Sequence, residues 1–333
     1  MRLSVIIKTL NEQRNIERAV RSALLAVDEA GGGEVIVADS LSTDDTVKIA
    51  ARFPVKIVQL VDPSDRCCGV GAQLGYQIAQ GEYVYILDGD MEFEADFLNE
   101  ASKALDANPR LAGVGGMVRE MNLDNQEFLN RSQRGLRHMR QGPVDRLDMG
   151  GLYRRSALQA VGYFTNRNLH AYEEFELAAR LQTAGWRLER LAIPGVKHYG
   201  HTESSFKLLG KRWRSRYAWG CGELLRQAWG QAHCGFVISR LHVYRLYGAV
   251  LLWMLVVLLM LVLAAWTQTL GWLLAAGVLG VAPVLLMTVR KRSLSRAVYA
   301  VSAWVVFAAG LVAGTVRGTA ASPTQPVSFS RLQ

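Results

Sequence analysis

The amino-acid sequence predicts an α/β domain built on a mostly parallel, doubly wound sheet, followed by membrane helices. The first observation is that short apolar runs alternate with segments of helical periodicity through the N-terminal part of the chain. The second is that the last third of the chain contains long runs without a charged residue. In sheets of this kind ligands bind beyond the carboxyl ends of the strands, so chemistry is expected there.

Four apolar runs are predicted to be buried strands, because they lack the polar alternation of a half-exposed strand. These runs are Leu3–Ile7, Glu34–Ala38, Val55–Leu60 and Tyr83–Leu87. Between them, the spacing of apolar residues predicts helices at about 14–27, 44–52 and 71–79. Strand and helix therefore alternate, which is typical of a parallel sheet.

The charge of the chain is divided unevenly. Its 333 residues include 38 Lys and Arg against 29 Asp and Glu, which gives a net charge of +9. Glu223 is the last acidic residue, and the 110 residues after it carry nine basic side chains. Because this excess belongs to an apolar tail, an anionic membrane surface is a better partner than nucleic acid. Charged residues at 20% exclude disorder, and the four cysteines form no CxxC motif.

Three uncharged runs are long enough to span a membrane, at 246–266, 270–289 and 297–316. Basic residues flank the first and third runs, whereas the turn between the first two has none. Positive residues tend to stay in the cytoplasm, so residues 1–245 are predicted to be cytoplasmic and the C-terminal tail to face outward. No signal peptide is expected, because only five apolar-type residues precede Lys8.

Glycines recur at every fourth position near the end of the third run, at Gly310, Gly314 and Gly318. Such spacing allows close contact between helices. Ordinary use of glycine in membrane helices would give the same pattern, so both interpretations stay open.

Acidic residues follow two of the predicted strands. Asp39 comes directly after the second strand, where its carboxylate could accept hydrogen bonds from a base or a ribose. Asp88 and Asp90 follow the fourth strand with Gly89 between them. Two such carboxylates can share Mg²⁺ or Mn²⁺ with the oxygens of a leaving diphosphate. An acidic surface turn is the plainer alternative.

A third acidic cluster begins a predicted helix within His170–Arg180. Glu173 and Glu174 would lie in its first turn, which suits the helix dipole. A carboxylate there that faced the metal site could instead take a proton from an acceptor hydroxyl. Gly150 and Gly151, some twenty residues earlier, would permit close backbone approach or form a plain turn.

Taken in order, these segments resemble family 2 glycosyltransferases, which are inverting enzymes with the GT-A fold. The matching segments are Ser4–Glu12, Asp39–Thr46, Gly81–Asp90, Asp148–Arg155 with Val161–Phe164, and Glu173–Arg180 with Gly185-Trp186. Together they cover about residues 3–200. The resemblance implies a single displacement in which a base activates an acceptor hydroxyl and a nucleoside diphosphate leaves.

The resemblance also implies roles for individual residues. The catalytic base falls on Glu174, where the family usually has Asp, and Glu173 is the second candidate. Gly150 and Gly151 lie on the acceptor side. Asp88 and Asp90 would bind the metal, and Asp88 would also face the ribose. The other residues assigned to the nucleotide sugar are Thr9, Asn11, Glu12, Asp39 and Arg66, with Asp39 on the base, often uracil.

The chain departs from the family pattern at two positions near the opening strand. Lys8 stands where the family usually has Pro, and Leu10 where it usually has Tyr. A histidine after Pro194-Gly195, either His198 or His201, would complete the metal site by the same resemblance, or would be a structurally satisfied side chain.

The segment between the two parts is predicted to form an amphipathic helix at the membrane interface, within residues 205–240. Arg212 and Trp213 within it resemble the end of the QxxRW motif of processive family members, which contacts the acceptor. Leu209 replaces the Gln of that motif. The predicted organisation is thus a GT-A domain at 1–204, this linker, and the three spans.

These observations predict a multi-pass protein of the inner (cytoplasmic) membrane that transfers sugar from a nucleoside-diphosphate sugar, such as a UDP-sugar, with Mg²⁺ or Mn²⁺. Its partners would be membrane lipids and a lipid-linked or growing polysaccharide acceptor, and not nucleic acid. One alternative is transfer to polyprenyl phosphate itself, and another is a non-catalytic scaffold that binds nucleotide sugar. The sequence leaves the oligomeric state open.

Overall fold

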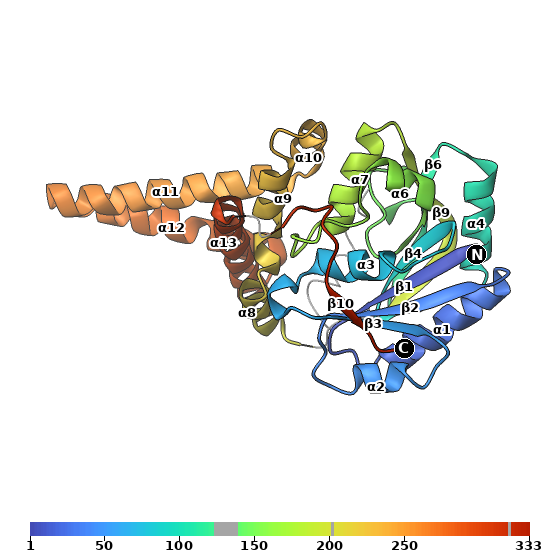
Figure 1. The fold of residues 1–333 in the computed structure, drawn as a ribbon. Helices are drawn as coiled ribbons and strands as arrows, with labels where there is room; N and C mark the ends of the chain where they lie inside the picture. The colour runs from blue at the N-terminus through green and yellow to red at the C-terminus, as the bar shows by residue number, and fades with distance from the viewer. Residues whose placement is uncertain (123–138, 201–202, 319–320) are drawn as a thin grey trace. The chain divides into compact units, whose positions relative to one another are not determined.

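The computed structural model describes residues 1–122, 139–200, 203–318 and 321–333, and these form two compact units (Figure 1). The first unit contains Met1–Glu203, Gly230–Phe236 and Gly318–Gln333. The second contains Ser204–Trp229 and Val237–Arg317. The chain therefore leaves the first unit and returns to it at its C-terminal end.

A single mixed sheet forms the frame of the first unit. Its strand order is β10-β3-β2-β1-β4-β8-β6-β9-β5, and β7 pairs with β9. The strands are β1 (Leu3–Thr9), β2 (Gly33–Asp39), β3 (Lys56–Leu60), β4 (Tyr83–Asp88), β5 (Met91–Phe93), β6 (Leu111–Glu120), β7 (Gly142–Val144), β8 (Gly151–Arg154), β9 (Arg187–His198) and β10 (Phe329–Arg331). The four strands predicted from the sequence are β1 to β4, and they are mutually parallel as expected.

Beyond β4 the sheet becomes mixed. Strand β8 pairs antiparallel with both β4 and β6, whereas β6 and β9 run parallel to each other. The predicted α/β sheet is confirmed, but its parallel pairing is concentrated in the N-terminal half. Antiparallel β8 brings Gly151 beside Ile86, close to the end of β4.

Helices cover both faces of the sheet, because alternate residues of the inner strands are buried on opposite sides. Val5 and Ile7 pack on one face together with α1, α2 and α4, and Ile6 packs on the other with α3, α6 and α7. The helices are α1 (Ile16–Glu29), α2 (Thr46–Ala50), α3 (Cys68–Tyr76), α4 (Phe97–Ala107), α6 (Arg155–Ala160) and α7 (Glu173–Thr183). A short 3₁₀ turn, η1, spans Pro63–Asp65.

The C-terminal segment forms the edge strand of this sheet. Strand β10 pairs antiparallel with β3, and the side chain of Gln77 bonds both backbone groups of Val327. We predicted that the C-terminal tail faces outward while residues 1–245 are cytoplasmic, but the pairing of β10 with β3 contradicts a placement of the two on opposite sides of a membrane. The prediction of three membrane crossings rested on the hydropathy of the three uncharged runs, whereas pairing between segments far apart in the chain is a tertiary property.

The second unit is helical. It contains α8 (Ser205–Arg214), η3 (Tyr217–Trp219), α9 (Gly220–Ala228), most of α10 (Cys234–Arg240), α11 (Val243–Thr267), α12 (Leu270–Lys291) and α13 (Leu294–Val316). Helices α11, α12 and α13 are each long and apolar enough to cross a membrane. Where one interfacial helix was expected within 205–240, the structure has several, because Arg216 and Gly230 adopt positive φ and break the helical path.

Candidate active site

The carboxyl ends of β1, β2 and β4 meet at one edge of the sheet. In register, Thr9 of β1 lies beside Asp39 of β2, and Lys8 of β1 lies beside Asp88 of β4. Parallel pairing forces this arrangement, because equivalent strand ends lie side by side. The residues that the sequence singled out at separate strand ends are therefore neighbours in space.

Asp39 is fully buried and its carboxylate is saturated with hydrogen bonds. One oxygen accepts from the hydroxyls of Thr9 at 3.1 Å and Ser42 at 2.5 Å. The other accepts from the Ser42 amide at 2.9 Å and the Gln59 side chain at 2.8 Å. A carboxylate offers about four such positions, so Asp39 ties three strand ends together rather than presenting a vacant acceptor.

The loop after β1 is held against the loop after β2. Asn11 adopts φ +59°, a conformation that Asn tolerates better than most residues. Its amide donates to the Ser42 hydroxyl and its side-chain oxygen accepts from the Thr43 amide, both at 2.8 Å. The amide of Glu12 donates to the Thr46 hydroxyl at 2.8 Å. This network fixes the loop that the family resemblance assigns to the nucleotide.

The side chain of Glu12 faces the acidic turn after β4. Burial raises the pKa of Glu12 to about 7, aided by the charges of Asp90 and Asp88 and opposed by a hydrogen bond from Asn15. A Cβ atom at Gly89 would lie 2.9 Å from the Glu12 Cγ. The glycine between the two aspartates is thus required for this close approach.

Lys8 links the acidic turn to the start of α7. Its Nζ lies 2.9 Å from Asp88 Oδ1 and 3.1 Å from Glu173 Oε1. Burial alone would lower the pKa of Lys8, but the charges of Asp88, Glu173 and Glu174 outweigh it and raise this pKa well above its usual value. One buried ammonium therefore holds together carboxylates from segments far apart in the chain.

Glu174 lies beside this group with an unused oxygen. The residue is 8% exposed, and its Oε2 atom is buried with no hydrogen-bond partner among the described residues. Burial raises the pKa of Glu174 well above its ordinary value, the charge of Lys8 opposes this, and Asp148 and Glu173 add to it. A carboxylate with an open oxygen and a raised pKa suits proton transfer.

The remaining acid of this helix has a structural role. Both oxygens of Glu176 accept from the Arg180 guanidinium at 2.9 Å, and the Tyr163 hydroxyl donates to it at 2.6 Å. Tyr172, directly before α7, has φ +67°, an unusual conformation for a bulky residue. This turn sets the direction in which the first residues of α7 point.

Asp90 was predicted to bind a metal ion with Asp88 and a histidine. His198 lies near it, with Nε2 3.4 Å from Asp90 Oδ2, while Nδ1 contacts Glu120 at 2.6 Å. Burial would lower the pKa of His198, but the hydrogen bonds to Asp90 and Glu120 raise it to about 9. Within the described ranges, no three acidic, His or Cys side chains form a metal-ligating cluster.

The carboxylates of Asp88 and Asp90 still fit a metal ion whose remaining ligands come from the substrate. Mg²⁺ in enzymes is held by one or two carboxylates plus phosphate oxygens, so a closed protein cage is not required. Asp90 and Asp88 supply that number of carboxylates. His201, the other histidine considered, lies outside the described residues.

Two predicted acceptor-side glycines lie at the same edge. Gly150 has φ +99°, and a Cβ there would collide with the Tyr85 hydroxyl. Gly151 begins β8 beside Ile86. Arg66, predicted to serve the phosphates, donates to the Leu41 carbonyl at 3.0 Å, and its buried Nε has no partner within the described part of the chain.

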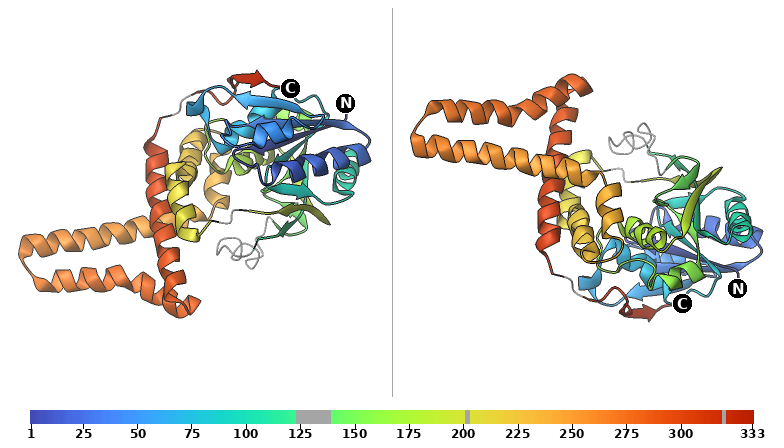
Figure 2. Two further views of the ribbon diagram at one scale, coloured as in Figure 1. Left: turned by 90° about the horizontal axis from the view of Figure 1, so that it is seen from below. Right: turned by 90° about the horizontal axis from the view of Figure 1, so that it is seen from above.

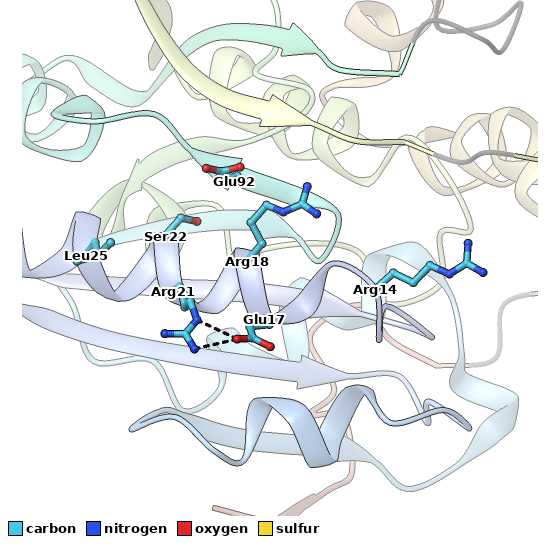
Figure 3. A pocket seen from close by; sticks show the side chains of 7 residues that line it. All are labelled: Arg14, Glu17, Arg18, Arg21, Ser22, Leu25 and Glu92. Carbon is cyan, nitrogen blue, oxygen red and sulfur yellow. Dashed lines mark hydrogen bonds and ion pairs between the residues drawn. The ribbon is translucent and has the colours of Figure 1, made fainter.

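The other predicted acceptor-side residues belong to the second unit. Arg212 and Trp213 belong to α8 in the second unit, where Arg212 lies over the Tyr217 ring and Trp213 contacts Trp219. Figure 3 shows a pocket along α1 and β5. None of the predicted site residues lines it. Its lining residues are Arg14, Glu17, Arg18, Arg21, Ser22, Leu25 and Glu92.

Sequence reasoning missed three residues of the site. Lys8 was noted only as a departure from the family pattern, although a lysine inside an apolar strand indicates a buried partner. Glu120 contacts His198 at 2.6 Å, and the charge of Asp148 raises the pKa of Glu174. Glu120 carried no local signal, because only the pairing of β6 and β9 brings it beside His198. Asp148 begins a segment that matches the family, but its closeness to Glu174 depends on the path of the chain before β8.

Comparison with known proteins identifies the class. Residues 4–162 match the family model described as glycosyl transferase family 2, so the chain carries a family 2 glycosyltransferase domain. It is 27% identical over 225 residues to the uncharacterized glycosyltransferase Rv0539 of Mycobacterium tuberculosis, covering 62% of this chain and 92% of that protein.

Two further relatives extend the comparison. The O-antigen chain rhamnosyltransferase WbaN of Salmonella anatum is 27% identical over 179 residues, which cover 50% of this chain and 56% of that protein. The mannosyltransferase PcManGT from Pyrobaculum calidifontis, solved with GDP-Man and Mn²⁺, has a TM-score of 0.58 at 20% identity. That match covers 95% of this chain and 86% of the other. The structural likeness shows the shared GT-A fold.

Proposed function

We propose that this protein is an inverting glycosyltransferase that moves a sugar from a nucleoside-diphosphate sugar to a lipid-linked or growing polysaccharide acceptor. The observation that carries the proposal is the contact of one Lys8 ammonium with both Asp88 and Glu173. This contact joins the end of β4, which the family resemblance assigns to the donor, to the start of α7, which it assigns to the activation of the acceptor. Donor and acceptor chemistry would then meet at one edge of the sheet.

Glu174 is the proposed general base. Its unpartnered Oε2 would accept the proton of an acceptor hydroxyl as that oxygen attacks the anomeric carbon. The bond from the anomeric carbon to the diphosphate oxygen breaks on the opposite side, so the configuration inverts. Glu173 stays paired with Lys8 and positions the turn that carries Glu174.

Asp90 and Asp88 are the residues that would hold Mg²⁺ or Mn²⁺, with His198 beside them. A bound divalent cation would neutralise charge that develops on the leaving diphosphate. Arg66 would add a second positive charge through its unpartnered Nε. Support comes from PcManGT, whose solved complex contains GDP-Man and Mn²⁺.

The proposed acceptor follows from the membrane helices. An enzyme held at the bilayer meets lipid-linked substrates at high local concentration. WbaN, a relative over half of this chain, is named as an O-antigen chain rhamnosyltransferase, and this supports a polysaccharide acceptor. The proposed location is the cytoplasmic face of the inner membrane, because basic residues flank the apolar helices.

The donor is tested by nucleotide binding to the full chain in detergent with Mn²⁺. UDP, GDP, CDP and dTDP are titrated against the wild-type protein, Asp90→Ala and the exposed control Asp45→Ala. We expect tight, metal-dependent binding of one diphosphate, retained by the control and lost in Asp90→Ala. Folded protein that binds none of the four would contradict the proposal and favour a structural role for the acidic turn.

The acceptor is tested with the donor so identified. Transfer to a polyprenyl-diphosphate saccharide is compared with transfer to the same saccharide free in water. We expect a clear preference for the lipid-linked form, and equal rates would refute the acceptor assignment. Direct glycosylation of polyprenyl phosphate that tolerates Glu174→Gln would favour the lipid-linked sugar donor alternative, because a phosphate nucleophile needs no strong base.

A further inference from the structure

The C-terminal segment is an integral part of the catalytic unit. Ser330 of β10 pairs with Gln59 of β3, and the Gln59 side chain in turn holds Asp39 at 2.8 Å. The Arg167 guanidinium donates to the Pro326 carbonyl at 2.8 Å, and Val327 is 2% exposed within the core. Residues after α13 therefore fold with the residues that precede α8, and the two lie on the same side of any membrane.

This return restricts how many helices can cross. A chain that leaves a folded unit and comes back to it crosses a bilayer an even number of times. Three helices between these segments have the length and hydropathy of spans. We propose that α11 and α12 cross as a hairpin, and that α13 lies in the lipid interface on the catalytic side without crossing.

Helix α13 is the most enclosed of the three. Within the most apolar stretch of α13, 28% of the residues are buried inside the protein, against 6% for the corresponding stretch of α11 and 11% for that of α12. A Cβ at Gly310 would collide with the Ala218 carbonyl, and one at Gly314 with the Trp219 carbonyl. The glycine spacing seen in the sequence thus fits α13 against η3 and α9 of the same chain.

The helices that enclose α13 are too polar for the bilayer core. The Arg226 guanidinium donates to the Gly314 carbonyl at 3.2 Å, and Arg317 lies 3.6 Å from the buried Glu223. At the other end Tyr299 contacts Phe206 of α8. The exposed basic residues of α8 and the turn after it are Lys207, Lys211, Arg214 and Arg216. If α13 crossed, this whole assembly would enter the hydrocarbon, which is costly.

The arrangement inside the second unit agrees with this. Helices α11 and α12 run side by side, and α13 runs across the base of their hairpin (Figure 2). Arg290, Lys291 and Arg292 mark the base, whereas residues 267–269 at the tip are uncharged. A hairpin that crosses the bilayer would therefore place α13 along the membrane surface, with the basic side chains of α8 facing anionic headgroups.

The test is the sidedness of three epitope tags in the full chain, expressed in a bacterial inner membrane. One tag precedes Met1, one is inserted after Gln268 at the hairpin tip, and one follows Gln333. Each is probed by protease in intact spheroplasts and in inverted vesicles. We expect the two terminal tags to be cleaved in the same preparation and the tip tag in the other.

Cleavage of the two terminal tags on opposite sides would overturn the proposal and restore three spans. Cleavage of all three on one side would overturn it as well, because the hairpin would not cross. Nucleotide binding by each tagged protein shows that the catalytic unit is folded. A second measurement uses Gly310→Leu and the matched control Gly280→Leu in α12, where a Cβ meets open space. Only Gly310→Leu should lower the thermal midpoint of the full chain, by several degrees, and an equal response of both would refute the packing of α13.

Discussion

The loop network around Asp39 and the acidic cluster around Glu174 lie at one edge of the sheet, yet they are built in opposite ways. Asp39 is fully buried and accepts four hydrogen bonds. Glu174 is almost as buried, but one oxygen lacks a partner in the described structure. A saturated carboxylate rigidifies its surroundings, whereas an unsatisfied one is costly to keep and indicates a use.

The comparison separates the roles of the two regions. In the proposed function, the Asp39 network would provide a preformed wall for the donor, and its energetic contribution should be mainly to stability and binding. The Glu174 region concentrates like charges around one ammonium, which is typical of sites that move protons. Substitutions in the two regions should therefore affect different measurements.

The largest effect is expected for Glu174→Gln. The amide cannot accept the acceptor proton, so kcat should fall about 10²–10⁴-fold while the protein stays folded. The raised pKa of Glu174 predicts that wild-type kcat/KM increases with pH through that elevated value, because the base acts in its deprotonated form. The variant should lose this acidic limb, and the partly exposed control Glu100→Gln should keep it. A variant with unchanged kcat would exclude Glu174 as the base.

Lys8→Met should affect both stability and the pH profile. Removing one partner of a buried ion pair leaves uncompensated charge, and because Asp88 is partly exposed we expect about 3 kcal/mol of destabilisation at neutral pH. The charge of Lys8 opposes the rise in the pKa of Glu174, so the acidic limb of kcat/KM should move to higher pH. Denaturant unfolding and pH–rate measurements check this against Lys103→Met, a surface lysine. A profile that stays in place would rule out coupling between Lys8 and the base.

Asp39→Asn should act on the donor wall. The new amide presents donors to groups that also donate, which should cost about 1–3 kcal/mol of stability. The affinity for the nucleoside diphosphate should fall in parallel, with little change in the acidic limb of the pH profile. Calorimetric titration and unfolding of the variant are compared with Asp45→Asn in the same loop. Wild-type affinity in Asp39→Asn would mean that the network does not shape the donor site.

The smallest effect is expected for Gln59→Ala. It removes one of the four hydrogen bonds to Asp39, and the net value of such a bond is about 1 kcal/mol. Strand β3, which carries Gln59, also pairs with β10 in the full chain. We expect the same loss of unfolding free energy whether or not nucleotide is bound. Denaturant unfolding with and without the diphosphate measures the two values. A loss as large as that of Asp39→Asn would show that Gln59 supports more than this one bond.

Much of the fold could be predicted from local patterns. The run Leu3–Ile7 is buried on both faces as expected, and the helix predicted at 14–27 is observed as α1. The periodicity of apolar residues and the hydropathy of each segment suffice here, because together they indicate which of its faces are buried. The antiparallel strands beyond β4 were not predicted, because strands such as β5 and β7 have three residues each and are too short to show a periodic alternation of apolar and polar residues.

The candidate site was predicted in part. Asp88, Asp90 and Glu174 were singled out by position and family resemblance, and the structure places Asp88 and the start of α7 around one lysine. The number of free acceptor positions on Asp39 could not be foreseen, because two of its partners come from the loop after β2 and from β3. Arg212 and Trp213 stay predictions, since they belong to the other unit.

The sequence by itself determined the order of strands β1 to β4 and of the helices between them, the uncharged helices and the acidic strand ends, because each depends on residues close together in the chain. Only the tertiary structure decided that Lys8 joins Asp88 to Glu173, that Gly310 packs against Ala218, and that β10 returns to β3. These contacts link segments widely separated in the chain. Their energy depends on packing and pairing that no local pattern records.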